Sequence, residues 1–294
     1  MIQLLQIPFS TSNLQEILKT LEQFLYSDKQ HHIATPNPEF LLESLQNPEF
    51  KKVLQNTSLN IPDGIGILWA TTIQEKIKKN KKNRTNAPLE HLFSSPILKY
   101  ILGIKYLATL LINPKSCKKI IPERITGTDL MAEIFRKFPD KKIFLLGAKE
   151  GIAEKAVKNL KCQISRQNDH IRLTNTKFQN SKLYDYFSGT PKAFDEKEIS
   201  TRINSFKPDI LFVAFGSPNQ ELWIAKNLSK IPSVKIAIGV GGAFDFFAGE
   251  KKRAPKIFQK LGIEWLYRLF IEPKRWKRIF NAVVIFPWKF LKSL

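Results

Sequence analysis

Asp63 stands where a carboxylate could meet a ligand, between Pro62 and Gly64 and directly after a short apolar run. A carboxylate at the edge of a cleft can take a proton from an attacking hydroxyl, and a glycine beside it lets a bulky ligand approach the backbone. The competing interpretation is a turn or helix-capping aspartate, a common role for this residue type. Asp63 is therefore a candidate general base.

Thr35 and Asn37 follow another apolar run. Asn37 precedes Pro38 and Asn47 precedes Pro48, and each pair is the arrangement of a helix N-cap followed by proline in the first turn, so two short helices are expected here. The N-terminus of a capped helix also presents free backbone amides to phosphate or sugar oxygens. Capping and ligand binding are therefore compatible roles for Asn37.

Two further segments combine glycine with polar side chains. Gly216-Ser-Pro-Asn-Gln-Glu221 reads as a tight turn before a helix, in which Gln220 and Glu221 are either ligand contacts or surface residues of the first turn. Gly239-Val-Gly-Gly242 is rich in glycine, but it is neither a dinucleotide fingerprint nor a P-loop. As a phosphate motif it is weak.

The C-terminal residues are basic and aromatic. No acidic residue follows Glu272, and six Lys or Arg are interleaved with five Trp or Phe in the segment after it. Guanidinium groups suit bidentate phosphate contacts, and basic residues among aromatics are typical of a membrane interface. A solvated helix face is the alternative for the arginines. The same composition could bind nucleic acid, but no nucleic-acid-binding motif is present. The arginines concerned are Arg253, Arg268, Arg275 and Arg278.

The elements that must position these residues are strands alternating with helices, which indicates a mainly parallel sheet covered on both faces. Ligands of such sheets bind beyond the carboxyl ends of the strands, where the polar segments above are expected to converge. The first helix is expected to start at a capping box formed by Ser12 and Gln15. The expected strands are 32–35, 59–62, 142–147, 209–215 and 234–240, and later helices are expected at 151–160, 196–206 and 220–228.

Residues 74–121 interrupt this alternation and are expected to be an insertion. Residues 76–84 are basic and poorly apolar, which predicts a loop. An apolar helical stripe follows and suits either a membrane-facing helix or a helix packed on the protein's own core. Its members are Tyr100, Ile101, Ile104, Leu107, Ala108 and Leu111.

Composition limits the classes of function that are possible but does not select one of them. The 294 residues carry 47 Lys and Arg against 26 Asp and Glu, a net charge of +21 that attracts polyanions.

The two cysteines and four histidines do not form the close pairs of a structural zinc site or a disulfide framework. The N-terminus lacks the pattern of a signal peptide, and no segment reads as a clean membrane span. No Asp-x-Asp pair or Gly-x-Ser-x-Gly elbow is present, so neither a metal-dependent transferase nor an α/β-hydrolase is expected. The cytoplasm is the expected compartment.

Taken in order, several motifs resemble those of the WecG/TagA/CpsF glycosyltransferase family over nearly the whole chain. They are Ile61-Pro-Asp63-Gly-Ile-Gly66, Glu123-Arg-Ile-Thr-Gly-Thr-Asp129, Phe144-Leu-Leu-Gly147, Gly216-Ser-Pro-Asn-Gln-Glu221, Gly239-Val-Gly-Gly-Ala-Phe-Asp245, Arg253-Ala-Pro255, Glu264-Trp-Leu-Tyr-Arg268 and Glu272-Pro273.

The resemblance implies an inverting transfer of a sugar, typically N-acetylmannosamine, from UDP to N-acetylglucosamine on a polyprenyl diphosphate. Such a reaction serves cell-surface polysaccharide or teichoic-acid synthesis and needs no cofactor or required metal. It implies attachment at the inner face of the plasma membrane, on an anionic membrane surface. Nucleic acid is not an expected partner, whereas a second copy of the chain is a candidate partner. The rival hypothesis is a non-catalytic basic α/β module that binds membrane or nucleic acid.

The resemblance also implies roles for individual residues and a division of the chain. Asp63 takes the position of the catalytic base. Residues 1–249 are expected to form an α/β core with a Rossmann-like parallel sheet, and residues 250–294 a basic helical C-terminal appendage that faces the membrane. The expected substrate-binding residues are Thr35, Asn37, Gly64, Thr126, Gly127, Asp129, Gln220, Glu221, Gly241, Arg253, Arg268 and Arg275.

Overall fold

The computed structural model describes residues 1–82, 101, 120–168, 183–255, 257–258 and 264–294. Its centre is a six-stranded sheet in the order β4-β3-β8-β7-β5-β6, in which every neighbouring pair is parallel. The predicted parallel sheet is therefore confirmed, although the sequence analysis did not predict β6. The strands are β3 (His31–Ala34), β4 (Leu59–Asn60), β5 (Ile143–Gly147), β6 (Tyr184–Phe187), β7 (Ile210–Ala214) and β8 (Ile236–Gly239).

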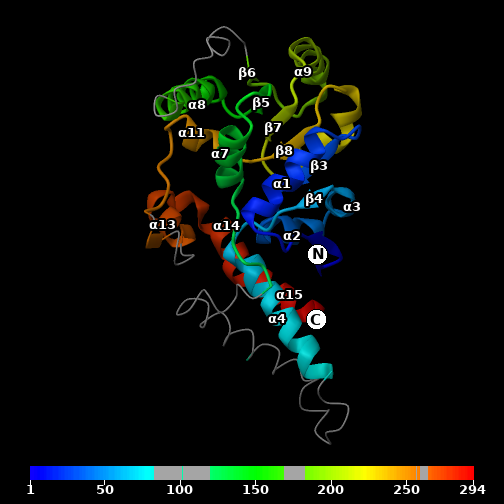
Figure 1. The fold of residues 1–294 in the computed structure, drawn as a ribbon. Helices are drawn as coiled ribbons and strands as arrows, with labels where there is room; N and C mark the ends of the chain where they lie inside the picture. The colour runs from blue at the N-terminus through cyan, green and yellow to red at the C-terminus, as the bar shows by residue number, and fades with distance from the viewer. Residues whose placement is uncertain (83–100, 102–119, 169–182, 256, 259–263) are drawn as a thin grey trace, which may run out of the picture.

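Helices cover both faces of the sheet (Figure 1). One face packs against α1 (Leu14–Leu25), α7 (Gly127–Lys137), α8 (Ile152–Asn168) and α11 (Ala243–Phe247). The other face packs against α9 (Ala193–Phe206) and α10 (Asn219–Asn227). Alternate residues of the central strands supply the two cores, as the two-residue period of a strand requires. In β5, for example, Leu145 belongs to the first core and Phe144 to the second.

Asparagine side chains define where three of the early helices begin. Asn37 and Asn47 cap α2 (Pro38–Ser44) and α3 (Pro48–Asn56), each with proline in the first turn, as predicted. The predicted capping box at Ser12 is wrong by one position. Asn13 caps α1, and its box partner is Glu16. The Asn–Glu pair forms the same kind of box one residue later, with the Asn13 N–H bound by the Glu16 side chain and the Glu16 N–H bound by the Asn13 side chain.

A third core lies beside the sheet, among α2, α3, the β1–β2 hairpin (Ile2–Leu4 and Ile7–Phe9), α4 (Ile65–Lys82) and the C-terminal helix. The predicted loop at 76–84 is wrong for residues 76–82, which continue α4. Lysine is a good helix former, and Ile73 and Ile77 extend the apolar face of α4 toward this core. Residues 83–84 and most of the predicted apolar stripe lie outside the described residues. Ile101 of that stripe has an exposed side chain.

The C-terminal appendage ends in one continuous helical run with two different faces. It comprises α14 (Trp276–Phe280), a π-helical turn η5 (Asn281–Ile285) and α15 (Phe286–Ser293), and it follows α13 (Glu264–Ile271) and η4 (Pro273–Arg275). Phe286 and Phe290 are buried against Trp69 of α4, and α15 lies beside α4 in Figure 1. The opposite face exposes an outer stripe at four-residue spacing, made of Trp276, Phe280, Val284 and Trp288.

The appendage therefore completes a core with its inner face and leaves its outer stripe uncovered within the described structure. Among the residues that the structure describes, no helix is long and apolar enough to cross a membrane.

The two faces of α15 should differ in their effect on stability. Phe290 is 0% exposed, so Phe290→Ala should lower the free energy of unfolding by about 3–5 kcal/mol. Trp288 is 50% exposed, so Trp288→Ala should cost about 1 kcal/mol or less. Equilibrium denaturation of both variants and the unmutated chain measures this. An equal loss of unfolding free energy in the two variants would show that α15 does not pack on α4 through the face that carries Phe290.

Candidate active site

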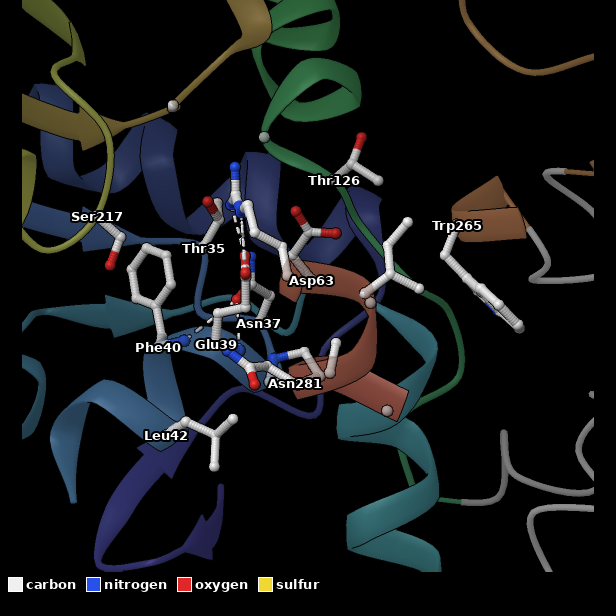
Figure 2. Close-up of a pocket in the computed structure, with 18 of the residues that line it drawn as sticks. Thr35, Asn37, Glu39, Phe40, Leu42, Asp63, Thr126, Ser217, Trp265 and Asn281 are labelled. Carbon is white, nitrogen blue, oxygen red and sulfur yellow. Dashed lines mark hydrogen bonds and ion pairs between the residues drawn. The ribbon is translucent and has the colours of Figure 1, made fainter. Parts of the chain in front are cut away.

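A pocket of about 730 Å³ opens at the carboxyl edge of the parallel sheet. The segments that follow β3, β4, β7 and β8 all contribute to its lining, as the sequence predicted. Figure 2 shows Asp63, Thr35 and Asn37 close together in this pocket, with Thr126 on one side and Phe40 and Leu42 on another. The expected site residues that line the pocket are Thr35, Asn37, Asp63, Gly64, Thr126, Gly127, Gln220, Gly241, Arg268 and Arg275.

Asp63 is held at the pocket by the turn that joins β4 to α4. Its backbone N–H donates to the Pro36 carbonyl over 3.0 Å, which ties the end of β4 to the loop after β3. Gly64 has φ of +97°, a conformation that side chains rarely adopt, and it lets the chain turn directly into α4. The Asp63 side chain thus faces the pocket from a tightly held backbone.

The surroundings of Asp63 make it a stronger base than an ordinary aspartate. Burial of its carboxyl group raises the pKa to about 6, and the nearby cations Arg124 and Arg268 oppose that rise. Glu264 and Asp129 add to it, because negative neighbours disfavour ionisation. A carboxyl with a pKa of about 6 is ionised at neutral pH and accepts a proton more readily than a carboxyl near 4.

Asn37 and Thr35 serve the fold and the pocket together. Asn37 Oδ1 accepts hydrogen bonds from the backbone N–H groups of Glu39 at 2.9 Å and Phe40 at 3.2 Å. Thr35 Oγ1 donates to the Gly239 carbonyl at 3.2 Å, which links the ends of β3 and β8. The capping interpretation of Asn37 is therefore confirmed, and the residue lines the pocket as well.

Gln220 and Glu221 are buried, so their interpretation as surface residues is wrong. Gln220 Oε1 accepts from the Gly241 N–H at 3.0 Å, and its Nε2 donates to Glu221 Oε1 at 3.0 Å. The other oxygen of Glu221 lies 2.5 Å from His32 Nε2 on β3. A Cβ atom at Gly239 would stand 2.1 Å from Glu221 Oε1, so this chain of hydrogen bonds requires glycine there.

Glu221 is consequently not part of the pocket lining. It supports the pocket indirectly, by binding the side chains of Gln220 and His32. His32, which the sequence analysis did not select, shares this role. No local signal marked His32, because its partner stands far away in the sequence.

Thr126, Asp129 and Arg253 form a second support at the N-terminus of α7. Thr126 caps this helix by accepting from the Asp129 N–H at 3.1 Å, and its hydroxyl donates to Asp129 Oδ2 at 2.7 Å. Both Nη groups of Arg253 donate to the Asp129 carboxylate. Burial would raise the pKa of Asp129, but the hydrogen bonds from Arg253 and Thr126 hold it below its usual range. Neither Asp129 nor Arg253 lines the pocket.

Arg124 is a site residue that the sequence analysis missed. It lines the pocket, and its Nη2 donates to Glu264 Oε2 at 3.0 Å. Arg268 Nη2 donates to the other oxygen of Glu264 at 2.6 Å. The signal was available, because Arg124 stands inside the quoted motif two residues before Thr126.

The arrangement places a base beside cations that favour a bound anion. Asp63 can accept a proton, while Arg124 and Arg268 can stabilise negative charge on a phosphate group. Arg275 lines the same pocket and pairs with Glu272 at 2.7 Å. Among the described residues, no group of three or more His, Cys, Asp or Glu side chains is placed to hold a metal ion.

Comparison with known proteins gives a family match over nearly the whole length. The model of the family described as "Glycosyl transferase WecG/TagA/CpsF family" matches residues 2–91 and 104–294, which include residues 74–91 and 104–121 of the predicted insertion. A protein of Bacillus spizizenii named N-acetylglucosaminyldiphosphoundecaprenol N-acetyl-beta-D-mannosaminyltransferase is 29% identical over 279 residues, which cover 94% of this chain and 85% of that protein. A Staphylococcus aureus protein of the same name is 28% identical over 298 residues, 99% of this chain and 92% of its own.

The buried pair behind the pocket should matter for stability. Glu221→Ala should lower the free energy of unfolding by about 1–3 kcal/mol for each buried polar group left without its partner, which here means His32 and Gln220. Glu250→Ala is the control, because Glu250 pairs with Lys155 on the surface. Denaturant unfolding measures both. If Glu221→Ala unfolds at the same denaturant concentration as the control, the buried pair does not stabilise the fold.

Proposed function

Because the chain belongs to the WecG/TagA/CpsF glycosyltransferase family, we propose that it moves N-acetylmannosamine from a UDP carrier to N-acetylglucosamine on a polyprenyl diphosphate. The chain is a glycosyltransferase, so the proposal concerns the two substrates and the residues that act on them. The acceptor and the sugar follow the printed names of the relatives. Membership of a glycosyltransferase family does not support the rival hypothesis of a non-catalytic basic module.

The observation that carries the proposal is the position of Asp63 in the pocket, next to Arg124 and Arg268. An inverting transfer needs a base for the acceptor and a stable leaving group on the donor. Asp63 supplies the first requirement. The two arginines supply positive charge for the second.

The reaction can be written through these groups in one displacement. The acceptor hydroxyl oxygen forms a bond to the anomeric carbon of the donor sugar while Asp63 takes its proton. The bond from that carbon to the diphosphate oxygen breaks, and UDP leaves with the electron pair. Arg124 and Arg268 balance the negative charge on the leaving diphosphate. Attack from the face opposite the leaving group inverts the anomeric centre.

Backbone amides add to the binding of phosphate oxygens. Gly127 and Thr128 line the pocket at the N-terminus of α7, where the first N–H groups of a helix lack partners within the helix. A Cβ atom on Gly127 would meet Thr35 Oγ1 at 3.4 Å. The helix start therefore lies close against the end of β3, and it opens toward the same space as Asp63.

The lining of the pocket suits an acceptor that is polar at one end and apolar at the other. Phe40 and Leu42 of α2 line it, as do Ile279, Ala282 and Val283 of the C-terminal helix. We place the sugar and diphosphate of the acceptor at Asp63 and the arginines, and the first part of the polyprenyl chain between these apolar side chains. Apolar contact of this kind favours burial of a hydrocarbon chain.

The outer stripe suits a membrane surface. Its aromatic side chains are exposed on the face of the helix opposite Phe290, and Lys277 and Lys292 lie over the rings of Trp276 and Trp288. Trp and Lys together are typical of peripheral attachment to an anionic bilayer. We propose that the appendage lies on the inner face of the plasma membrane, where it meets a lipid-linked acceptor.

A coupled assay tests the substrates and the base together. The purified chain should release UDP from UDP-N-acetylmannosamine only when N-acetylglucosamine diphosphate on a synthetic lipid is present. Asp63→Asn should reduce this rate about 10²–10⁴-fold, because an amide cannot accept the proton. The rate of the unmutated chain should fall as the pH drops through about 6, because Asp63 is protonated below its pKa.

Parallel reactions with UDP-N-acetylglucosamine and UDP-glucose check the donor. Faster release from one of them would overturn the assignment of N-acetylmannosamine. Normal turnover of Asp63→Asn would remove Asp63 from the reaction, and no UDP release with any donor would sink the proposed function.

Membrane attachment through the outer stripe is testable with point variants. The double change Trp276→Glu with Trp288→Glu should weaken binding to phosphatidylglycerol vesicles by about tenfold or more, because two aromatic side chains no longer enter the interface. Phe194→Glu is the matched control, since Phe194 is an exposed aromatic residue on α9. Vesicle sedimentation measures binding, and equal binding by both variants would place the membrane contact elsewhere.

A further inference from the structure

Glu264, the first residue of α13, is a buried carboxylate between two pocket arginines. The residue is only 4% exposed, and it lines the pocket. Arg124 and Arg268 each donate to a different one of its oxygens, at 3.0 and 2.6 Å. Burial would raise the pKa of Glu264, but Arg268 and Arg124 hold it below its usual range, so the carboxylate is charged at neutral pH.

The pair with Arg124 joins distant parts of the chain. Arg124 stands in the segment that leads into α7, whereas α13 packs mainly on η4 and α14 of its own appendage. A second interaction to the α/β part is the Arg268 guanidinium, which lies 5.2 Å from the centre of the Phe246 ring on α11. Glu264 also binds Arg268, so this carboxylate takes part in the first of these interactions and adjoins the second.

Glu264 also changes the charge that Asp63 experiences. The charged groups that act on Asp63 come from the segment before α7, from α7 itself and from the appendage. The cations are Arg124, Arg253 and Arg268, and the anions are Asp129 and Glu264. Asp129 is already bound by Arg253. Glu264 is therefore the anion that directly contacts the other two cations.

We propose that Glu264 is a positioning residue for sugar transfer: it fastens α13 over the pocket and serves as the counter-anion of Arg124 and Arg268. The inference rests on the proposed function, in which Asp63 is the base. Two guanidinium groups without a counter-anion would stabilise the ionised form of Asp63 and make it a weaker base. Glu264 opposes that effect while keeping both cations at the pocket.

The counter-anion role is compatible with binding of the donor. A guanidinium carries five N–H donors, and each bond to Glu264 is made by an Nη2 group. A diphosphate can therefore be bound by the same arginines without displacing Glu264. The carboxylate itself touches neither the sugar nor the diphosphate in this scheme.

The test is the pH dependence of kcat/KM for Glu264→Gln, which keeps the shape of the side chain and removes its charge. The acid limb of the pH profile, where the rate falls as Asp63 is protonated, should move to lower pH by roughly one unit. Arg124 and Arg268 then act on Asp63 without the opposing charge of Glu264. The rate at neutral pH should fall by about 10–100-fold, because the arginines and α13 are less firmly placed. Glu250→Gln, which alters a surface pair with Lys155, should leave the limb and the rate unchanged.

Arg268→Gln provides a shift of opposite sign. Loss of this cation should move the acid limb to higher pH, because Arg268 lowers the pKa of Asp63. General damage to the fold would not move the limb in opposite directions in two variants. Circular dichroism and thermal melting identify any variant that fails to fold, and Glu264→Asp, which keeps the charge, then replaces Glu264→Gln and should keep the limb near that of the unmutated chain.

The outcomes separate the inference from the function on which it rests. An unmutated chain with no acid limb near pH 6 would count against Asp63 as the base. A limb near pH 6 that stays in place in Glu264→Gln, or moves upward, would overturn the role of Glu264 alone. A lower rate with an unmoved limb would reduce Glu264 to a structural ion pair.

Discussion

The parallel alignment of β3 with both β4 and β8 is the constraint on which the pocket depends. Ile33 of β3 is paired with Leu59 on one side and Ile238 on the other, so the three strands end at the same edge. Each strand then leaves the sheet through a polar segment, and these segments meet because the strands do. The hydrogen bond from Thr35 to the Gly239 carbonyl fastens two of these strand ends together.

Charge balance is the second determinant of the site. Arginines enter the pocket region from the segment before α7 and from the appendage, and each is bound to a carboxylate. Arg124 and Arg268 pair with Glu264, Arg253 with Asp129 and Arg275 with Glu272. Pairing of this kind lowers the cost of keeping cations at a partly buried site. It also leaves Asp63 in surroundings where burial dominates, so its pKa rises despite the arginines.

The C-terminal helix connects the chemistry to the fold and to its proposed membrane surface. Its inner face completes the core around Trp69, and residues on its flank line the pocket. Its outer stripe remains exposed in the structure. A helix whose two faces are both apolar needs two partners, and the described part of the chain supplies a partner for the inner face. This arrangement would hold the pocket at a fixed distance from a bilayer.

Local patterns in the sequence were enough to predict the parallel sheet, most of its strands, the caps at Asn37 and Asn47 and the convergence of polar segments on a pocket. Hydrophobic periodicity and capping signals are encoded by neighbouring residues. They were not enough to find the pairing of Glu221 with His32, the bridge from Arg124 to Glu264 or the packing of Phe290 on Trp69. Those contacts join residues far apart in the chain. Only the folded backbone brings them within hydrogen-bonding or van der Waals distance, and so only the tertiary structure decided which charges surround Asp63.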